Sequence, residues 1–462
     1  MESSKLARRG FVLQGSLGLS AALGGTLFHG LRASAMPQDP PVRNPRSTDG
    51  DRRFEPDWKE RLTVTVGNSR EGSLSASGAD FVGENDRVVQ AALDYIKRFG
   101  GGTVKLLAGT FVFRNSVFLP SGVRLVGSGL DTILTKIASE TLAIESDSDW
   151  YDREITLGQS GSFQVGDGVV LRAKNPDNGG PIVIKRTLVA RDGNRFKLDR
   201  GLRENLWIEG KPTCSSLFPI LTSENTEDVW IEDLAIDGNK ANNQNLDGNY
   251  GGCIFLQDCN RYTIRNVTAR NYNGDGISFQ ICHDVLVESC HSHDNQDLGL
   301  HPGSGSQRPV MRSNRLERND QGLFWCWGVK FGLAEDNTMV ANRSYGSSIG
   351  HNDTDNVMRR NRIVDSGKIG VLFRDDARGI DFWANRNVLE ENHILNSGGQ
   401  DGVAIEVQGK TRELVFRKNE LHETRGAQGR VGIRLGKDSG KVEMDSNRIE
   451  GFSKDLEDLR GR

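Results

Sequence analysis

The chain has 462 residues, of which 59 are basic and 62 acidic, so its formal net charge is −3. This balance argues against a nucleic-acid-binding protein, which needs a cationic surplus. Glycine is frequent, with 55 residues, whereas proline contributes only 12. The length would ordinarily suggest several domains, but a glycine-rich chain with few prolines also suits one long repeat architecture.

The first 35 residues have the features of an export signal. Arg8 and Arg9 precede a glycine-rich apolar stretch, and Ala33-Ser34-Ala35 supplies the small residues that a signal peptidase accepts. Segment 1–35 resembles a twin-arginine signal, which implies a bacterial protein exported to the periplasm or beyond, with no membrane association after cleavage. A retained anchor is the alternative. Proline-rich residues 36–57 are predicted to form a flexible linker.

Residues 85–98 are predicted to form a helix that caps the N-terminal end of the fold. Asp86 can cap this helix, and its apolar face would carry Val89, Ala92, Leu93 and Ile96. Residues 140–212 lack the periodicity described below and contain hairpin-like runs, so we expect a β-rich insertion beside one mouth of a groove.

From about residue 251 the sequence repeats with a period near 24 residues. Short alternating runs within each repeat predict strands, and coils of this size must stack to bury their apolar faces. The pattern therefore predicts a parallel β-helix. Glycines are expected to supply positive φ angles at the coil corners, at Gly276, Gly299, Gly322, Gly346 and Gly370.

Asparagines mark the repeat and are expected to point inward, where they can bond turn backbone groups and one another. The main series is Asn266, Asn314, Asn337, Asn361, Asn392, Asn419 and Asn447, with Cys290 in the vacant position. A second series is Asn271, Asn295, Asn319 and Asn342.

The cysteines show no metal-type spacing, and a protein exported after folding would fold in a reducing compartment. We therefore expect most of them to be small buried apolar residues. They are Cys214, Cys253, Cys259, Cys282, Cys290 and Cys326.

The first coils carry a family resemblance. Asp80–Asp86, Gly100–Phe111 and Leu119–Gly127 together resemble the opening of the pectate lyase and polygalacturonase superfamily. The resemblance implies an all-β, single-stranded right-handed parallel β-helix of about ten or more coils. The domain would span residues 58–455, followed by a tail over 456–462, and would bind a polysaccharide.

Two aspartates are the leading catalytic candidates. Asp275 and Asp297 resemble, in their spacing of about one coil, the aspartate motifs of polygalacturonases. Glycosidic cleavage needs two carboxyl groups, one to protonate the leaving oxygen and one to attack or activate water. The chain departs from the family pattern at two places. Gln296 occupies one position of the family's Asp-Asp pair, and the segment around Gln321, one coil after Asp297, lacks the histidine that the family has there. Two ordinary turn aspartates are the alternative.

Histidines gather in the same region. His301 and His351 are candidate acid or base groups because imidazole titrates near neutral pH. The run from His351 through Asp353 and Asp355 also fits a calcium site or a hydrogen-bonded turn, and these interpretations stay open. No certain cofactor or metal-ligand set is predicted.

Asp353 and five further residues are predicted to bind substrate. An exposed ring of Trp325 or Trp327 would stack on a sugar, although strand alternation would place one ring in the core. Lys330 and Arg374 could hold a substrate carboxylate, and Asp376 lies beside Arg374.

Three functions remain in competition. The leading one is a secreted glycoside hydrolase with aspartates as acid and base. The second is a polysaccharide lyase or uronate C5-epimerase that uses histidine and arginine, with calcium as its candidate ion. The third is a non-catalytic carbohydrate-binding β-helix. The sugar and the oligomeric state are left open by the sequence.

Overall fold

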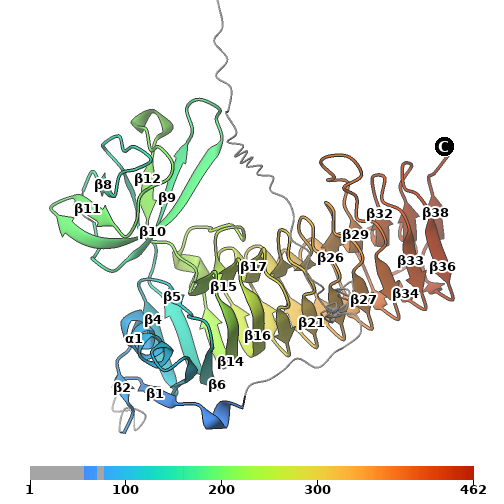
Figure 1. Ribbon diagram of the computed structural model, residues 1–462. Coiled ribbons are helices and arrows are strands. Elements are labelled where there is room, and N and C mark those ends of the chain that lie inside the picture. The colour runs from blue at the N-terminus through green and yellow to red at the C-terminus, as the bar shows by residue number, and fades with distance from the viewer. Residues whose placement is uncertain (1–56, 70–77, 160, 462) are drawn as a thin grey trace, which may run out of the picture. The chain divides into compact units, whose positions relative to one another are not determined.

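The computed structural model describes residues 57–69, 78–159 and 161–461. The predicted export signal and all of the predicted linker except Asp57 lie outside these residues. The described strands form one 21-stranded sheet, one 11-stranded sheet and one six-stranded sheet. Figure 1 shows successive coils stacked side by side from the N-terminal strands to β38.

The 11-stranded sheet takes one strand from each coil, and its neighbouring strands are parallel. Its members are β5 (Val117–Phe118), β13 (Leu221–Glu224), β15 (Gly252–Gln257), β17 (Asp275–Gln280), β20 (Leu298–Pro302), β23 (Gln321–Phe324), β26 (Tyr345–Ile349), β29 (Ile369–Phe373), β32 (Val403–Val407), β35 (Val431–Leu435) and β38 (Lys454–Asp458). Eleven successive strands confirm a stack of about ten or more coils. The stack reaches Asp458, beyond the predicted domain end at residue 455.

The 21-stranded sheet forms the remaining walls of the coils. Its members are β1 (Thr63–Gly67), β2 (Phe81–Val82), β3 (Gly102–Leu106), β4 (Gly109–Phe113), β6 (Val123–Lys136), β14 (Glu227–Asp237), β16 (Asn260–Arg270), β18 (Leu286–Glu288), β19 (His291–His293), β21 (Val310–Arg312), β22 (Arg315–Glu317), β24 (Leu333–Glu335), β25 (Thr338–Val340), β27 (Val357–Arg359), β28 (Arg362–Val364), β30 (Val388–Glu390), β31 (His393–Leu395), β33 (Leu414–Arg417), β34 (Glu420–His422), β36 (Val442–Asp445) and β37 (Arg448–Glu450). From β18 onward each coil supplies two short strands to this sheet, so a coil has three strands in all.

The core lies inside the stack because in-register apolar residues repeat from coil to coil. Ile277 pairs with Leu300, and Leu300 with Leu323, and all three are at most 1% exposed. The six cysteines are buried and form no disulfide, which confirms the prediction.

The asparagine ladder is confirmed from Asn314 onward. The side-chain amide of each donates to the side-chain oxygen of the next, through Asn337, Asn361, Asn392, Asn419 and Asn447. Cys290 fills the position before Asn314, whose side-chain oxygen accepts from its backbone N–H. Asn266 was wrongly assigned: it is exposed, adopts a left-handed φ of 52° and donates to Asp233.

In the second series, Asn295 and Asn319 are linked in the same way, and Asn342 accepts from the backbone of Asn319. Asn271 does not belong to it. Tyr272 holds that position, since its backbone N–H donates to Asn295.

The repeating glycines have a different role from the one predicted. Gly276 and Gly299 do not adopt positive φ. Instead they face the interior polar ladder, where a Cβ on Gly276 would lie 2.0 Å from Ser292 Oγ and one on Gly299 2.6 Å from Asn319 Nδ2. Glycine is therefore required here for close approach.

Helix α1 (Asp86–Lys97) packs against β1 and β3 at the N-terminal end of the stack. Its predicted apolar face is buried. Asn85, and not Asp86, is the N-cap, because its side chain accepts from the backbone of Arg87. Asp86 accepts from the backbone of Arg114 instead. Among the described residues, three short 3₁₀ helices cover Trp58–Glu60, Ile208–Gly210 and Lys240–Asn242.

The six-stranded sheet forms the insertion and has its own apolar core. Its members are β7 (Thr141–Ala143), β8 (Glu154–Thr156), β9 (Gly168–Lys174), β10 (Pro181–Asp192), β11 (Arg195–Leu198) and β12 (Thr213–Ser215). The insertion is joined to the first coils by a 2.7 Å ion pair between Arg114 and Asp167. Within the described ranges, no helix combines the length and apolar character needed to cross a membrane.

Candidate functional site

The outer face of the 11-stranded sheet brings several predicted residues together. Strand pairing places Ser278 beside His301, and Phe324 beside Ser348. The rings of His301 and Phe324 meet edge to face, with centroids 5.2 Å apart. These four side chains form one row that runs across successive coils.

Asp275 and His301 form a buried pair within this face. Asp275 Oδ2 lies 2.7 Å from His301 Nδ1, and Asp275 Oδ1 accepts from the backbone of Leu298 at 3.0 Å. Gly248 closes the pair from outside, since a Cβ there would lie 1.7 Å from Asp275 Oδ2. His301 therefore points away from the coil interior, as predicted, but is only 2% exposed.

The pair retains a proton at neutral pH. Burial alone would lower the pKa of His301, but hydrogen bonds with Asp275 and then Cys326 raise it to about 10. Burial also raises the pKa of Asp275, against the hydrogen bond with His301. His301 is thus held as a cation. A cation of this kind is a poor general base.

Asp297 lies on the coil after Asp275 but is offset from it by one residue. The backbone of Asp297 donates to Gly274, because Asp275 is aligned with Leu298 one residue further along. The residue in register with Asp297 on the next coil is Asp320, whose N–H donates to the Asp297 carbonyl at 2.7 Å. Adjacent coils are separated by about 4.8 Å, so Asp297 and Asp320 occupy neighbouring positions along the stack.

The Asp297 carboxyl lies in a crowded acidic environment. Its Oδ2 accepts from Asn245 Nδ2 at 2.8 Å. Burial is the main cause that raises the pKa of Asp297, and the nearby carboxylates of Asp275, Asp247 and Asp320 raise it further. A carboxyl with a raised pKa beside another carboxyl is the pairing that glycosidic acid–base chemistry requires.

Arg374 contacts Phe324 and Ser348 in the row of side chains on the outer face. Its guanidinium lies 4.3 Å from the centroid of the Phe324 ring. It donates to Ser348 Oγ, to an oxygen of Asp376 and to the Trp325 carbonyl, each at 2.9 Å. Only 12% of the Arg374 side chain is exposed. The contacts of the Arg374 guanidinium are therefore with the protein itself, and Asp376 is its ion-pair partner.

The two tryptophans have opposite environments. Trp325 is fully buried in the core, so the prediction that it contacts a sugar is wrong. Trp327 is 42% exposed and stacks on His351 with ring centroids 4.5 Å apart. The predicted alternation of one inward and one outward ring is confirmed, and Trp327 alone can meet a ligand.

His351 and Lys330 lie away from the buried pair. His351 Nδ1 accepts from the backbone of Arg378, and the His351 ring also meets Phe382 edge to face. Lys330 lies on the adjoining turn, where its charge helps to lower the pKa of Asp355, although burial and Arg386 affect that carboxyl more.

Asp353 acts as a turn cap. It is fully buried and accepts from the backbone N–H groups of Gly328, Val329 and Gly350. Burial raises its pKa to about 6, although Arg374 acts in the opposite direction. Asp355 pairs with Arg386 at 2.8 Å. The carboxylates of Asp353 and Asp355 are thus bonded to protein donors. This supports the hydrogen-bonded turn over the calcium site that the sequence also allowed.

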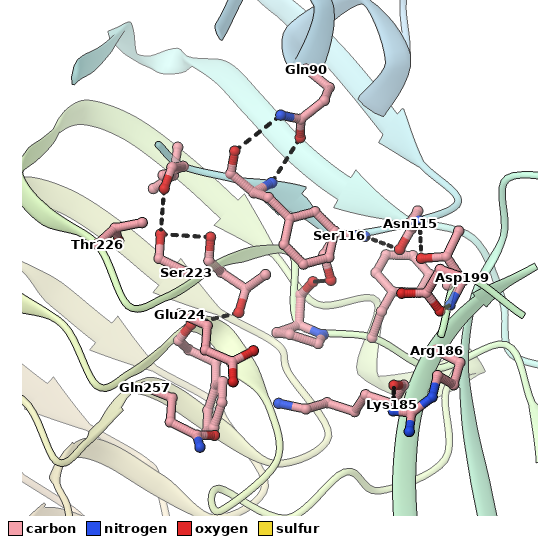
Figure 2. A pocket seen from close by; sticks show the side chains of 18 of the residues that line it. Gln90, Asn115, Ser116, Lys185, Arg186, Asp199, Ser223, Glu224, Thr226 and Gln257 are labelled. Carbon is pink, nitrogen blue, oxygen red and sulfur yellow. Dashed lines mark hydrogen bonds between the residues drawn. The ribbon is translucent and has the colours of Figure 1, made fainter. Parts of the chain in front are cut away.

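A cavity of about 430 Å³ lies between the first coils and the insertion, and sequence reasoning missed it. Its walls come from α1, β5, β13 and β15 on one side and from β9 and β10 on the other. Figure 2 shows Lys185 extending into this space toward Glu224 and Gln257. The insertion, predicted to flank a groove, supplies one wall.

Lys185 is the notable group in the cavity. Its Nζ lies 3.9 Å from the centroid of the Phe255 ring, and burial lowers its pKa to about 8, although Glu224 opposes this. Among the described residues, its ammonium group has no hydrogen-bond or ion-pair partner. Phe255 pairs with Ser278, so the cavity continues the row that contains His301.

Comparisons with known proteins agree with this fold. Residues 233–382 match the family model described as "Right handed beta helix region". No curated protein matches the sequence. The surface protein and adhesin PfbA of Streptococcus pneumoniae is 13% identical with a TM-score of 0.52, covering 86% of this chain and 99% of that one.

Two further structures match with lower TM-scores. The A-module of the mannuronan C-5 epimerase AlgE6 of Azotobacter vinelandii is 15% identical with a TM-score of 0.49, covering 80% of this chain and 91% of that one. The Gp54 tailspike of the Acinetobacter baumannii bacteriophage AP22, in complex with a capsular saccharide, is 12% identical with a TM-score of 0.37, covering 80% and 69%. The likeness to PfbA, at 13% identity, shows the fold alone. The chain is a right-handed parallel β-helix protein.

Proposed function

We propose that this protein is an exported enzyme that binds a polysaccharide along the outer face of the 11-stranded sheet and hydrolyses its glycosidic bonds. The observation that carries the proposal is the in-register placement of Asp297 and Asp320 on adjacent coils, together with the raised pKa of Asp297. Asp297 would donate its proton to the leaving oxygen. Asp320 would act as the second carboxylate.

The coil spacing sets the expected stereochemistry. Carboxyl groups about 5–5.5 Å apart are typical of retaining glycosidases, and adjacent coils lie about 4.8 Å apart. Asp320 would attack the anomeric carbon as the bond to the leaving oxygen breaks, forming a glycosyl ester. Asp297, now ionised, would take a proton from water, which would hydrolyse the ester and restore both groups.

The substrate is proposed to be an acidic glycan. Lys185 keeps a largely buried ammonium group in the cavity without an ion-pair partner in the described structure. A desolvated cation of this kind favours an anionic ligand. Exposed Trp327 offers a ring that can stack on a sugar further along the same face.

The buried pair argues against the lyase alternative with His301 as base. A lyase or epimerase needs a group that removes the proton beside the substrate carboxylate, whereas His301 remains protonated to about pH 10. His301 would instead stabilise the fold beneath the acidic residues.

Product analysis on a panel of uronate-containing and neutral polysaccharides tests the proposal. New reducing ends without ultraviolet absorbance are expected. Absorbance from unsaturated ends would identify a lyase and overturn the proposal. Binding without turnover across the panel would also overturn it, in favour of a carbohydrate-binding protein.

A further inference from the structure

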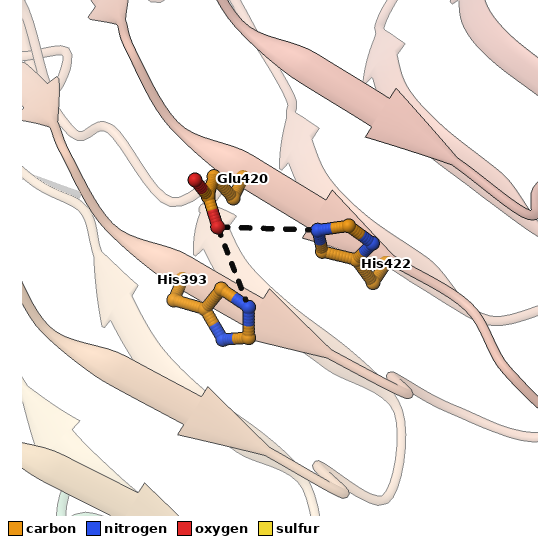
Figure 3. A group of neighbouring side chains, drawn as sticks. All are labelled: His393, Glu420 and His422. Carbon is orange, nitrogen blue, oxygen red and sulfur yellow. Dashed lines mark ion pairs between the residues drawn. The ribbon is translucent and has the colours of Figure 1, made fainter.

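A second cluster of chemically versatile side chains lies on the outer surface of the 21-stranded sheet, near the C-terminal end. Pairing of β31 with β34 sets His393 beside Glu420, and His422 follows two residues later on the same face (Figure 3). Glu420 Oε2 lies 3.6 Å from His393 Nε2 and 4.0 Å from His422 Nε2. One ligand atom from each residue falls within 4.8 Å of the others.

We propose that His393, Glu420 and His422 form a binding site for a divalent transition-metal ion of the zinc class, with water completing the coordination. Two imidazoles and a carboxylate are a ligand set that zinc and its neighbours prefer. Metal–ligand bonds of about 2.0–2.2 Å would require the three atoms to move slightly closer together. Half-exposed side chains on a fixed β-ladder can make that adjustment.

The contacts of His422 also suit a metal ligand. His422 Nδ1 lies 3.4 Å from Glu450 Oε2, on the next strand. A carboxylate beside the second ring nitrogen is the usual outer partner of a metal-bound histidine, because it leaves Nε2 free for the ion.

Arg362 opposes binding and provides a test. Its guanidinium lies 3.3 Å from His393 Nδ1. If Nε2 binds the metal, Nδ1 carries the ring proton, and Arg362 must turn away. Arg362 is exposed and can do so. Arg362→Gln, whose amide oxygen can accept that proton, should tighten metal binding.

A second histidine pair supplies a matched control. His291 and His293 lie two residues apart on β19, and their ring centroids are 4.1 Å apart. The neighbouring carboxylate of Glu317, however, is already paired with Arg315 and Arg318. That carboxylate is neutralised by arginine, so this pair should not bind a metal in the same way.

Calorimetric titration of the tag-free, chelator-treated full chain with zinc, and cobalt absorption spectra, test the proposal. One equivalent of zinc should bind to the wild type. The H393A/H422A variant should bind zinc about 10- to 100-fold more weakly, whereas H291A/H293A should bind like the wild type. Circular dichroism confirms that each variant is folded. Absence of stoichiometric binding, undiminished binding by H393A/H422A, or an equal loss in H291A/H293A would overturn the proposal. None of these outcomes depends on glycan cleavage.

Discussion

His301 Nδ1 lies 2.7 Å from Asp275 Oδ2, and neither residue is more than 2% exposed. The folded chain holds a proton on this pair with a His301 pKa of about 10, whereas an unfolded histidine titrates near ~6.5. Between these values the folded state binds more protons than the unfolded state. The stability that the pair contributes is therefore complete below about pH 6.5 and is lost as pH rises toward 10.

Asp275→Asn should remove that stabilisation and leave a buried imidazole without its counter-ion. Loss of one partner of a buried pair typically costs about 3–5 kcal/mol. Urea unfolding followed from pH 6 to pH 10 should show a falling wild-type stability and a lower, flatter profile for the variant. Glu443→Gln, at an exposed position on β36, should follow the wild type. Parallel profiles for wild type and Asp275→Asn would refute this role.

Arg374→Met tests whether Arg374 is structural. The variant keeps apolar contact with Phe324 but loses donation to Ser348 and Asp376. Hydrogen bonds to charged groups contribute about 1.5–3 kcal/mol each, so the melting temperature should fall clearly. Arg374→Lys should recover only part of it, because lysine lacks the planar fork. An unchanged melting temperature with impaired glycan binding would assign Arg374 to the substrate instead.

The interior ladder predicts a position-dependent cost. Asn361 donates to the Ala334 carbonyl and to Asn392, and accepts from the backbone and side chain of Asn337. Asn361→Ala should leave buried groups without partners, each costing about 1–3 kcal/mol. Asn447→Ala, at the partly exposed end of the ladder, should cost less because water can replace the amide. Equal losses in denaturant unfolding would contradict the ladder account.

Lys185→Met should weaken binding of uronate oligosaccharides while leaving neutral ones unaffected. The ammonium is charged below its pKa of about 8, so wild-type affinity for the acidic ligand should fall as pH rises through that value. The variant should show no such pH dependence. Calorimetry at pH 6.5 and pH 9 provides the measurement. Equal affinity of wild type and variant for the acidic ligand would rule out Lys185 as the anion-binding group.

Local periodicity was sufficient to predict the coils, because apolar alternation and asparagine spacing report stacking directly. It could not predict one-residue offsets. Asn266 precedes the ladder position that Val267 occupies, and Asp275 aligns with Leu298 rather than Asp297. Such offsets arise where a strand departs from strict alternation of inward and outward side chains. The spacing of aspartates in the sequence does not reveal these departures.

The burial and the neighbours of each candidate residue also could not be predicted from the sequence. Asp275 is buried because the loop at Gly248, distant along the chain, closes over it. The cavity at Lys185 exists because the insertion folds back beside β5 and β13. Both depend on non-local packing. The residue types near the site were predictable, whereas the pairing of Asp297 with Asp320 required the register.

The central claim is that Asp297 and Asp320 cleave a glycosidic bond together. The most direct measurement is the initial rate of reducing-end release by Asp297→Asn and Asp320→Asn on the polysaccharide that the wild type degrades. Each variant should lose about 10²–10⁴-fold in rate, as expected for loss of a general acid or its partner, with the melting temperature retained. Wild-type rates in both folded variants would contradict the account.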